Sequence, residues 1–248
     1  MLYIGKRRIS PQQKIDFSPK QIAECYMVFG GTPYYLNLLD RSKTLNANID
    51  ALYFDKQGEL RSEFGFLFRS LFNDATIYLR IVKILSEHPE GLSLNEIAQK
   101  LETSKGGSLS SVLQNLCDCD FLSEYRAFGK KQRDTTYKLI DFYSLFYLKF
   151  VEVAALSNWT SSSDDPICRS WYASAFELLC YCHIDIIKKA LGISGVATSV
   201  STWRYFSSVV FSAHCAGVTP TNFLNVRCST VRSENPQCSA TASALHSR

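Results

Sequence analysis

The alternation of apolar and polar positions predicts helices along the opening part of the chain. A Ser-Pro-Lys-Gln run at 18–21 has the order of a capping box, which predicts a helix over 19–29 ending at two glycines. A second short helix is expected from Pro33. Residues 44–72 then predict one or two helices that share one aromatic face.

The pattern changes between residues 77 and 141, where three helices and then two strands are expected. The two runs that follow the helices are interpreted as an outgoing and a returning strand, and a charged turn separates them. Three helices followed by a two-stranded wing are typical of a winged helix. The expected elements are a helix over 77–85, a short helix opened by a capping box at 93–96, a helix from a capping Ser108, and strands at 121–125 and 135–140.

The remaining ordered part is also predicted to be helical. An aromatic run at 142–150 is expected to continue as a helix to about Ala155, buried because its aromatic residues occur on every side. The Ser/Asp-rich stretch 157–165 is interpreted as a linker. A long helix over 166–191 is expected to stop at Gly192.

The two ends differ in composition from the rest of the chain. Residues 1–17 are basic and aperiodic, which indicates a leader without regular structure. Residues 205–248 contain no lysine and a single acid, Glu234, and are rich in Ser, Thr, Cys and Ala. A disordered tail and a shifted reading frame both explain this composition. The gain of cysteine with the loss of lysine favours the shifted frame.

Composition and charge narrow the class of protein. The net charge of +4 is too small to indicate a nucleic-acid partner by itself. No apolar stretch approaches the roughly 20 residues that span a bilayer, and no signal peptide opens the chain. We therefore expect a cytoplasmic protein with no membrane partner, whose cysteines are free thiols.

Several phrases of the sequence occur in the same order in one known family. The chain resembles the archaeal-type ATPases, a branch of the AAA/STAND P-loop group whose members run from an ATPase core through a winged helix to a restriction-endonuclease-like domain. The matching phrases are Phe29-Gly30-Gly31-Thr32-Pro33-Tyr34-Tyr35-Leu36, Gly106-Gly107-Ser108-Leu109, Phe128-Gly129-Lys130-Lys131, Leu139-Ile140-Asp141-Phe142 and Ala175-Phe176-Glu177-Leu178.

This resemblance implies a mainly α fold divided into five parts. An ATPase-lid remnant and a winged-helix domain would precede a truncated α/β nuclease-like segment and an irregular tail. The implied bounds are 1–17 for the leader, 18–75 for the helical lid, 76–141 for the winged helix, 142–204 for the start of the nuclease-like domain and 205–248 for the tail.

The phosphate-binding loop of the family is missing. No G-x-x-x-x-G-K-[ST] run occurs, so the backbone cradle and lysine that hold nucleotide phosphates are absent from the sequence. We therefore expect no catalytic residue, no bound cofactor and no enzyme activity of the chain alone; ATP and Mg²⁺ are expected only for an intact family member.

Two residues acquire candidate roles from the resemblance. Pro33 would contact an adenine ring, although a proline that simply starts a helix is the competing interpretation. Glu177 matches the first acidic residue of the nuclease-like site, but the Asp and E-x-K partners that would complete a metal site are absent. Glu177 is therefore interpreted as a relic or as a polar residue beside the core.

Two pairs of cysteines, Cys117 with Cys119 and Cys180 with Cys182, are interpreted as core thiols rather than zinc ligands. Both pairs are expected on helices, where residues i and i+2 point in different directions.

The third helix of the winged helix and its wing provide the candidate DNA contacts. The helix would enter the major groove from its N-terminal end, while basic wing residues would contact phosphates. The candidates are Lys105, Ser108, Ser110, Ser111, Gln114, Arg126, Lys130, Lys131 and Arg133. Asp118 and Asp120 at the far end of the helix oppose such binding.

The sequence thus predicts a catalytically inactive ATPase fragment whose winged helix binds DNA or a protein partner. Two alternatives remain at this point: an ATPase subunit completed in trans by a separate P-loop chain, and a pseudogene product without function.

Overall fold

The computed structural model describes residues 17–102, 107–126, 135–194, 198–199 and 227–228. These residues are mostly helical, with a small three-stranded antiparallel sheet, which confirms the expected mainly α class. The chain forms two units, Met1–Ile187 and Lys188–Arg248, which are described separately. The predicted leader and most of the predicted tail lie outside the described residues.

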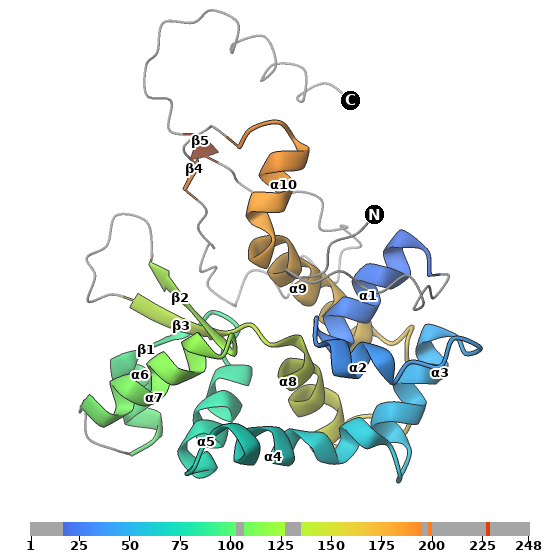
Figure 1. Ribbon diagram of the computed structural model, residues 1–248, viewed down its shortest axis with the longest axis horizontal. Helices are drawn as coiled ribbons and strands as arrows, with labels where there is room; N and C mark the ends of the chain where they lie inside the picture. Colours follow the sequence, from blue (N-terminus) through green and yellow to red (C-terminus); the bar gives the residue numbers. More distant parts are fainter. Residues whose placement is uncertain (1–16, 103–106, 127–134, 195–197, 200–226, 229–248) are drawn as a thin grey trace, which may run out of the picture. The chain divides into compact units, whose positions relative to one another are not determined.

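The elements of the first unit are short, and most of them are helices (Figure 1). The helices are α1 (Pro19–Phe29), α2 (Pro33–Asn37), α3 (Leu45–Ile49), the π-helix η2 (Asp50–Phe54), α4 (Glu59–Leu71), α5 (Ala75–Ser86), α6 (Leu94–Lys100), α7 (Gly107–Asp118), α8 (Phe142–Phe146), the π-helix η4 (Tyr147–Glu152) and α9 (Pro166–Cys182). A further helix, α10 (Ile184–Ala190), begins in this unit and ends in the second. The strands are β1 (Leu92–Ser93), β2 (Leu122–Arg126) and β3 (Thr135–Leu139).

The predicted starts of the first helices are confirmed. Ser18 Oγ accepts a hydrogen bond from Gln21 N at 3.3 Å, and Ser18 N donates to Gln21 Oε1 at 3.0 Å, so the capping box is complete. Gly30 then ends α1 with a φ of 68°, a conformation that glycine adopts without steric cost. Two helical stretches separated by a turn fill residues 45–71, as expected, although the sequence did not predict the π-helical turn η2.

Residues 75–139 contain the expected order of three helices and two strands, together with the short additional strand β1. The sheet order is β1-β3-β2, and both pairs are antiparallel. The second capping box is confirmed, since Ser93 N donates to Glu96 Oε2 at 2.7 Å. The expected cap at Ser108 is wrong: α7 begins at Gly107, whose carbonyl accepts a bond from Ser111 Oγ at 2.9 Å, so Ser108 lies inside the first turn.

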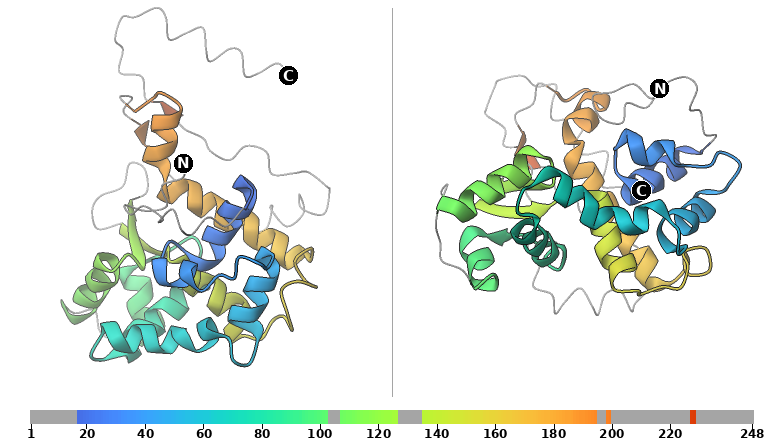
Figure 2. Two further views of the ribbon diagram at one scale, coloured as in Figure 1. Left: turned by 45° about the vertical axis from the view of Figure 1, so that its right-hand side comes forward. Right: turned by 60° about the horizontal axis from the view of Figure 1, so that its bottom comes forward.

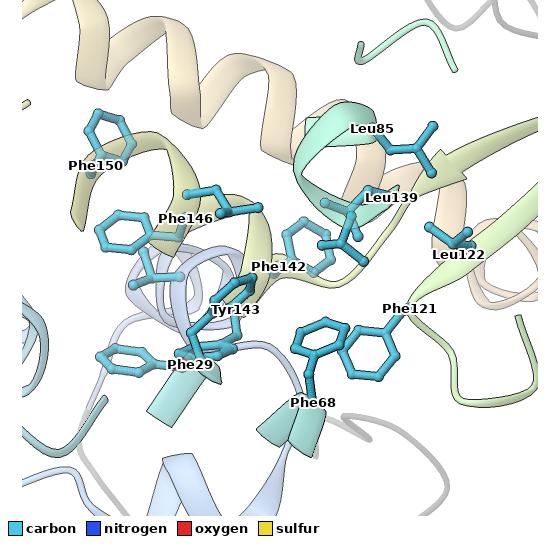
Figure 3. Packing of buried hydrophobic residues seen from close by; sticks show 14 of the residues in the cluster. Phe29, Phe68, Leu85, Phe121, Leu122, Leu139, Phe142, Tyr143, Phe146 and Phe150 are labelled. Carbon is cyan, nitrogen blue, oxygen red and sulfur yellow. The ribbon is translucent and has the colours of Figure 1, made fainter. Parts of the chain in front are cut away.

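One hydrophobic core joins the helices on both sides of α8. In both figures α5, α6 and α7 gather with the sheet on one side of α8, while α1, α2 and α3 lie on the other (Figures 1 and 2). Figure 3 shows Phe68 and Phe121 facing each other within this core, with ring centroids 4.8 Å apart. Tyr143 Oη also donates to the Leu60 carbonyl at 3.0 Å. The core therefore continues from the first helices into the sheet-containing part.

The helix that follows the sheet is shorter than expected. It ends at Glu152 rather than near Ala155, and its second half is the π-helix η4. Most of its aromatic side chains are buried, as predicted: Phe146 and Phe150 are fully enclosed, while Tyr147 is half-buried.

The interpretation of 157–165 as a linker is wrong. Trp159 has no exposed surface, and its indole lies 5.0 Å from the Phe146 ring and 5.2 Å from the Phe150 ring, centroid to centroid. Burial of a large aromatic side chain offsets part of the entropy that is lost when a polar stretch is ordered. The polar residues around Trp159 therefore form an ordered loop.

The single helix predicted over 166–191 is interrupted at His183. This residue ends α9 with φ −115° and ψ 23°, and α10 begins at the next residue. The His183 ring packs edge-on against Tyr26 with centroids 5.4 Å apart, a contact that a straight helix pattern does not predict. The expected stop at Gly192 agrees with its φ of 72°. In the second unit, Thr198–Ser199 (β4) pairs antiparallel with Arg227–Cys228 (β5).

Candidate functional sites

Helix α7 has one apolar face and one polar face. Leu109, Leu113 and Leu116 are buried, at the spacing that places them on one side of a helix. The four candidate DNA contacts that α7 contributes are exposed: Ser108, Ser110, Ser111 and Gln114. The polar face is therefore available to a partner.

Three polar side chains of this helix already have partners within the protein. Ser111 Oγ donates to the Gly107 carbonyl, and Gln114 Nε2 donates to Asp118 Oδ1 at 2.8 Å. Asn115 Nδ2 donates to Tyr78 Oη of α5 at 2.8 Å. Asn115 thus anchors α7 to α5, whereas Ser108 and Ser110 occupy the exposed N-terminal turns.

The described charges near α7 are acidic at its C-terminal end. Asp118 is the last helical residue, and Asp120 follows in a left-handed conformation with a φ of 60°. On the sheet, Lys138 of β3 places its Nζ 5.2 Å from the centroid of the Tyr125 ring. The acidic end predicts repulsion of phosphate groups there.

Most of the predicted basic contacts lie outside the described residues. These are Lys105, Lys130, Lys131 and Arg133, while Arg126 is described only as the last backbone position of β2. Their role as phosphate contacts stays a prediction.

The Gly-Gly-x-Pro segment lies between α1 and α2, with Gly30 buried and residues 31–33 exposed. Pro33 is the first residue of α2 and is exposed. The Tyr26 side chain lies against Gly31: a Cβ at Gly31 would come within 3.1 Å of Tyr26 Cε2. Next to Pro33, Tyr34 Oη donates to Glu59 Oε2 at 3.3 Å. The negative charge of Glu59 repels phosphate and other anions beside Pro33.

Asp141 connects this segment to the region of the sheet. Its Oδ2 accepts a hydrogen bond from Ser144 N at 2.8 Å and so caps α8, and its Oδ1 is 3.9 Å from the position of a Cβ at Gly30. Burial of the carboxyl group raises the pKa of Asp141, and the hydrogen bond from Ser144 N opposes this shift. Two of the phrases that carry the family resemblance therefore meet at the start of α8.

The described residues assemble no metal centre. Among them no group of three His, Cys, Asp or Glu side chains lies close enough to hold an ion. Glu177 is exposed on α9, so the structure places it on the surface. Of the paired cysteines, Cys180 and Cys182 lie on α9, Cys117 is in the last turn of α7, and Cys119 follows that helix. Cys119 and Cys182 are exposed, which corrects the interpretation of all four as core thiols.

The sequence did not predict one partly buried polar contact, which holds the loop 157–165 in place. Asp50 in η2 accepts hydrogen bonds from the backbone N–H groups of Trp159 and Thr160, the latter at 3.1 Å, and from the Thr160 hydroxyl. The tryptophan inside an otherwise polar run is the one sequence feature that indicates an ordered loop. No sequence feature indicates that its partner is Asp50, which lies more than a hundred positions earlier in the chain.

These geometries define a mainly helical protein with a small antiparallel sheet and a helix, α7, whose polar face is exposed. Comparisons with family models, with curated proteins and with solved structures found no match. No helix of the described residues is long and apolar enough to cross a membrane.

Proposed function

We propose that residues 76–141 form a winged-helix module that binds DNA through the N-terminal half of α7 and the wing between β2 and β3. The chain alone would bind without catalysing a reaction. The observation that carries this proposal is the orientation of α7, whose apolar side is buried and whose short hydrogen-bonding side chains are exposed.

The order of elements supports the proposal. Helix α5 is followed by β1, α6, α7, β2 and β3, and the three strands pair in the order β1-β3-β2. In winged and other helix-turn-helix modules the second or third helix lies in the major groove, with its N-terminal residues at the base edges. Ser108 and Ser110 have that position in α7, and serine hydroxyls donate to or accept from any base. Ser111 lies beside them, but its hydroxyl donates to the Gly107 carbonyl.

The charges support an oriented approach of the DNA. The helix N-terminus carries a partial positive charge, whereas Asp118 and Asp120 make the C-terminal end negative. A phosphate backbone is therefore attracted to the end that carries the serines. In the sequence, lysines 130 and 131 between the two wing strands add positive charge to the same module.

The test is the binding of the full chain to a fluorescent mixed-sequence DNA duplex, measured by anisotropy from about 50 to 200 mM salt. Each lost phosphate contact reduces the slope of log K against log salt by about 1. The double variant Lys130→Gln/Lys131→Gln should therefore lose about 2 from this slope. Lys56→Gln, an exposed lysine on the turn after η2, is the matched control and should keep the wild-type slope.

A second pair of substitutions probes the other end of α7. Asp118→Asn/Asp120→Asn removes the repulsive charges and should tighten binding several-fold at low salt, an advantage that screening removes at high salt. Salt-independent binding of the wild type, or equal slopes for the Lys56 and wing variants, would show that the proposed phosphate contacts do not exist.

A subunit completed in trans by a P-loop chain is the second candidate. It is favoured by one observation: the segment Gly31–Tyr34 is exposed, so Pro33 would meet the uncharged adenine ring of a nucleotide whose phosphates another polypeptide holds away from Glu59. Isothermal titration of ATP into the chain alone should then give no heat of binding. The alternative fails if Pro33→Ala leaves nucleotide affinity unchanged once a P-loop partner chain is added.

A further inference from the structure

Tyr78 connects α5, on which it lies, with α4 and α7. Its ring is stacked on that of Phe72, the residue that ends α4, with centroids 3.7 Å apart and ring planes 6° apart. Its hydroxyl accepts a hydrogen bond from Asn115 Nδ2 of α7 at 2.8 Å. Tyr78 and Phe72 are both buried. The stacked ring therefore holds the hydroxyl in a fixed place, and α7 is bonded to it there.

Helix α5 also holds the end of the helix that precedes α7. Arg80 Nη2 donates to the carbonyl of Leu101, the residue that ends α6, at 3.2 Å. Because Arg80 is two positions after Tyr78, one short stretch of α5 makes directional polar contacts with both α6 and α7. Both helices are thus positioned against α5.

The bond from Asn115 fixes how α7 is rotated about its own axis. Asn115 is seven positions after Ser108, which is about two helical turns, so the two residues lie on the same side of α7. The buried leucines hold α7 against the core, but apolar contact has no preferred direction, whereas a hydrogen bond has one. A rotation of α7 that breaks the Asn115 bond would therefore also turn Ser108.

We propose that Tyr78 is a positioning residue for the DNA binding of α7, an inference that rests on the function proposed above. Its hydroxyl keeps α7 in the rotation that presents Ser108 and Ser110 to the base edges. Tyr78 itself is buried and does not touch the DNA. Without the hydroxyl, α7 would have the binding orientation for only a fraction of the time, and the apparent Kd for DNA would rise by the inverse of that fraction.

The size of this effect is limited by the strength of one neutral hydrogen bond, which changes an equilibrium constant by about two- to tenfold. Tyr78→Phe removes the hydroxyl and leaves the ring stacked on Phe72, so the Kd for DNA should rise by about this factor. No phosphate contact is lost, so the slope of log K against log salt should stay that of the wild type. The wing variant Lys130→Gln/Lys131→Gln differs, because it should lose slope.

The test is the anisotropy titration of the mixed-sequence duplex with the full chain and its variants at several salt concentrations, below the thermal midpoint of each variant by circular dichroism. Tyr143→Phe is the matched control, because the same substitution breaks another bond of a buried tyrosine, from Tyr143 Oη on α8 to the Leu60 carbonyl at 3.0 Å. It should lower the stability of the fold and leave both Kd and slope unchanged. Without DNA, hydrogen exchange of the peptide 107–118 should be faster in Tyr78→Phe than in Tyr143→Phe.

The outcomes separate this inference from the function on which it rests. If the wild type binds DNA with the expected salt dependence but Tyr78→Phe binds as tightly as Tyr143→Phe, the positioning role is refuted and the proposed function stands. A smaller salt slope for Tyr78→Phe would also refute the positioning role, because it would show that phosphate contacts were lost. A wild type that does not bind DNA refutes the proposed function, and this inference with it.

Discussion

Replacement of Trp159 by alanine is the most direct test of how the loop 157–165 is held. The indole has no exposed surface and packs edge-on against Phe146, Phe150 and Tyr172, with centroids 5.0, 5.2 and 5.8 Å away. Removal of a buried tryptophan costs about 3–5 kcal/mol, because the lost transfer free energy adds to that of the cavity. For a chain of this size each kcal/mol lowers the thermal midpoint by about 2–4 °C, so we expect a decrease of about 6–20 °C.

The assay is urea and thermal unfolding of the full chain, followed by far-ultraviolet circular dichroism. Val153→Ala is the matched control, since Val153 lies just before the same loop but is 67% exposed, and its free energy of unfolding should change by less than about 0.5 kcal/mol. If Trp159→Ala were no more destabilising than Val153→Ala, the loop would be the linker that its composition suggests, and the packing argument would be refuted.

Three further predictions concern polar groups of the same core. Asp50→Asn should lower the free energy of unfolding in urea by about 1–3 kcal/mol, because the amide N–H group would face the Thr160 hydroxyl and N–H, from which the carboxylate accepts. Its effect should not add to that of Trp159→Ala, since both substitutions loosen the same loop. Burial raises the pKa of Asp141, so the folded protein binds this proton more tightly than the unfolded chain. The stability of the wild type should therefore fall relative to that of Asp141→Asn as the pH rises from the ordinary pKa of 3.8 through the raised pKa. A stability difference that does not change with pH would contradict this. Burial also raises the pKa of the Cys25 thiol to about 12, so a thiol reagent at neutral pH should label exposed Cys119 and spare Cys25 until the protein is unfolded, as read by peptide mass spectrometry.

Contacts between near neighbours in the sequence were the predictable part of the fold. Both capping boxes, at Ser18 and at Ser93, join residues three positions apart, so the sequence contains both partners side by side. The same holds for the buried face of α7, whose leucines repeat at helical spacing. Local chemistry decides these features, and tertiary packing then preserves them.

Contacts between distant residues produced the errors. The sequence around the loop does not indicate that Asp50 accepts hydrogen bonds from the N–H groups of Trp159 and Thr160. Likewise, the sequence around His183 does not indicate that Tyr26 packs against the His183 ring where α9 ends. The two π-helical turns, η2 and η4, could not be predicted from the sequence either. Their residues have ordinary helical spacing, and only the packed structure shows where the extra residue is accommodated.

The candidate DNA-binding face of α7 depends both on local helical periodicity and on contacts with distant residues. Together they determine which side chains of α7 are available to a ligand. Periodicity predicts that Asn115 is exposed and polar, yet Tyr78 of α5 binds its amide. Gln114 is likewise bound to Asp118, within the same helix. The hydrogen-bonding groups still available are therefore concentrated toward Ser108 and Ser110, at the end where the helix dipole is positive and away from the acids at 118 and 120. A DNA ligand that approached the C-terminal half of α7 would meet occupied amides and like charge, so sequence discrimination by this helix should depend on its first two turns.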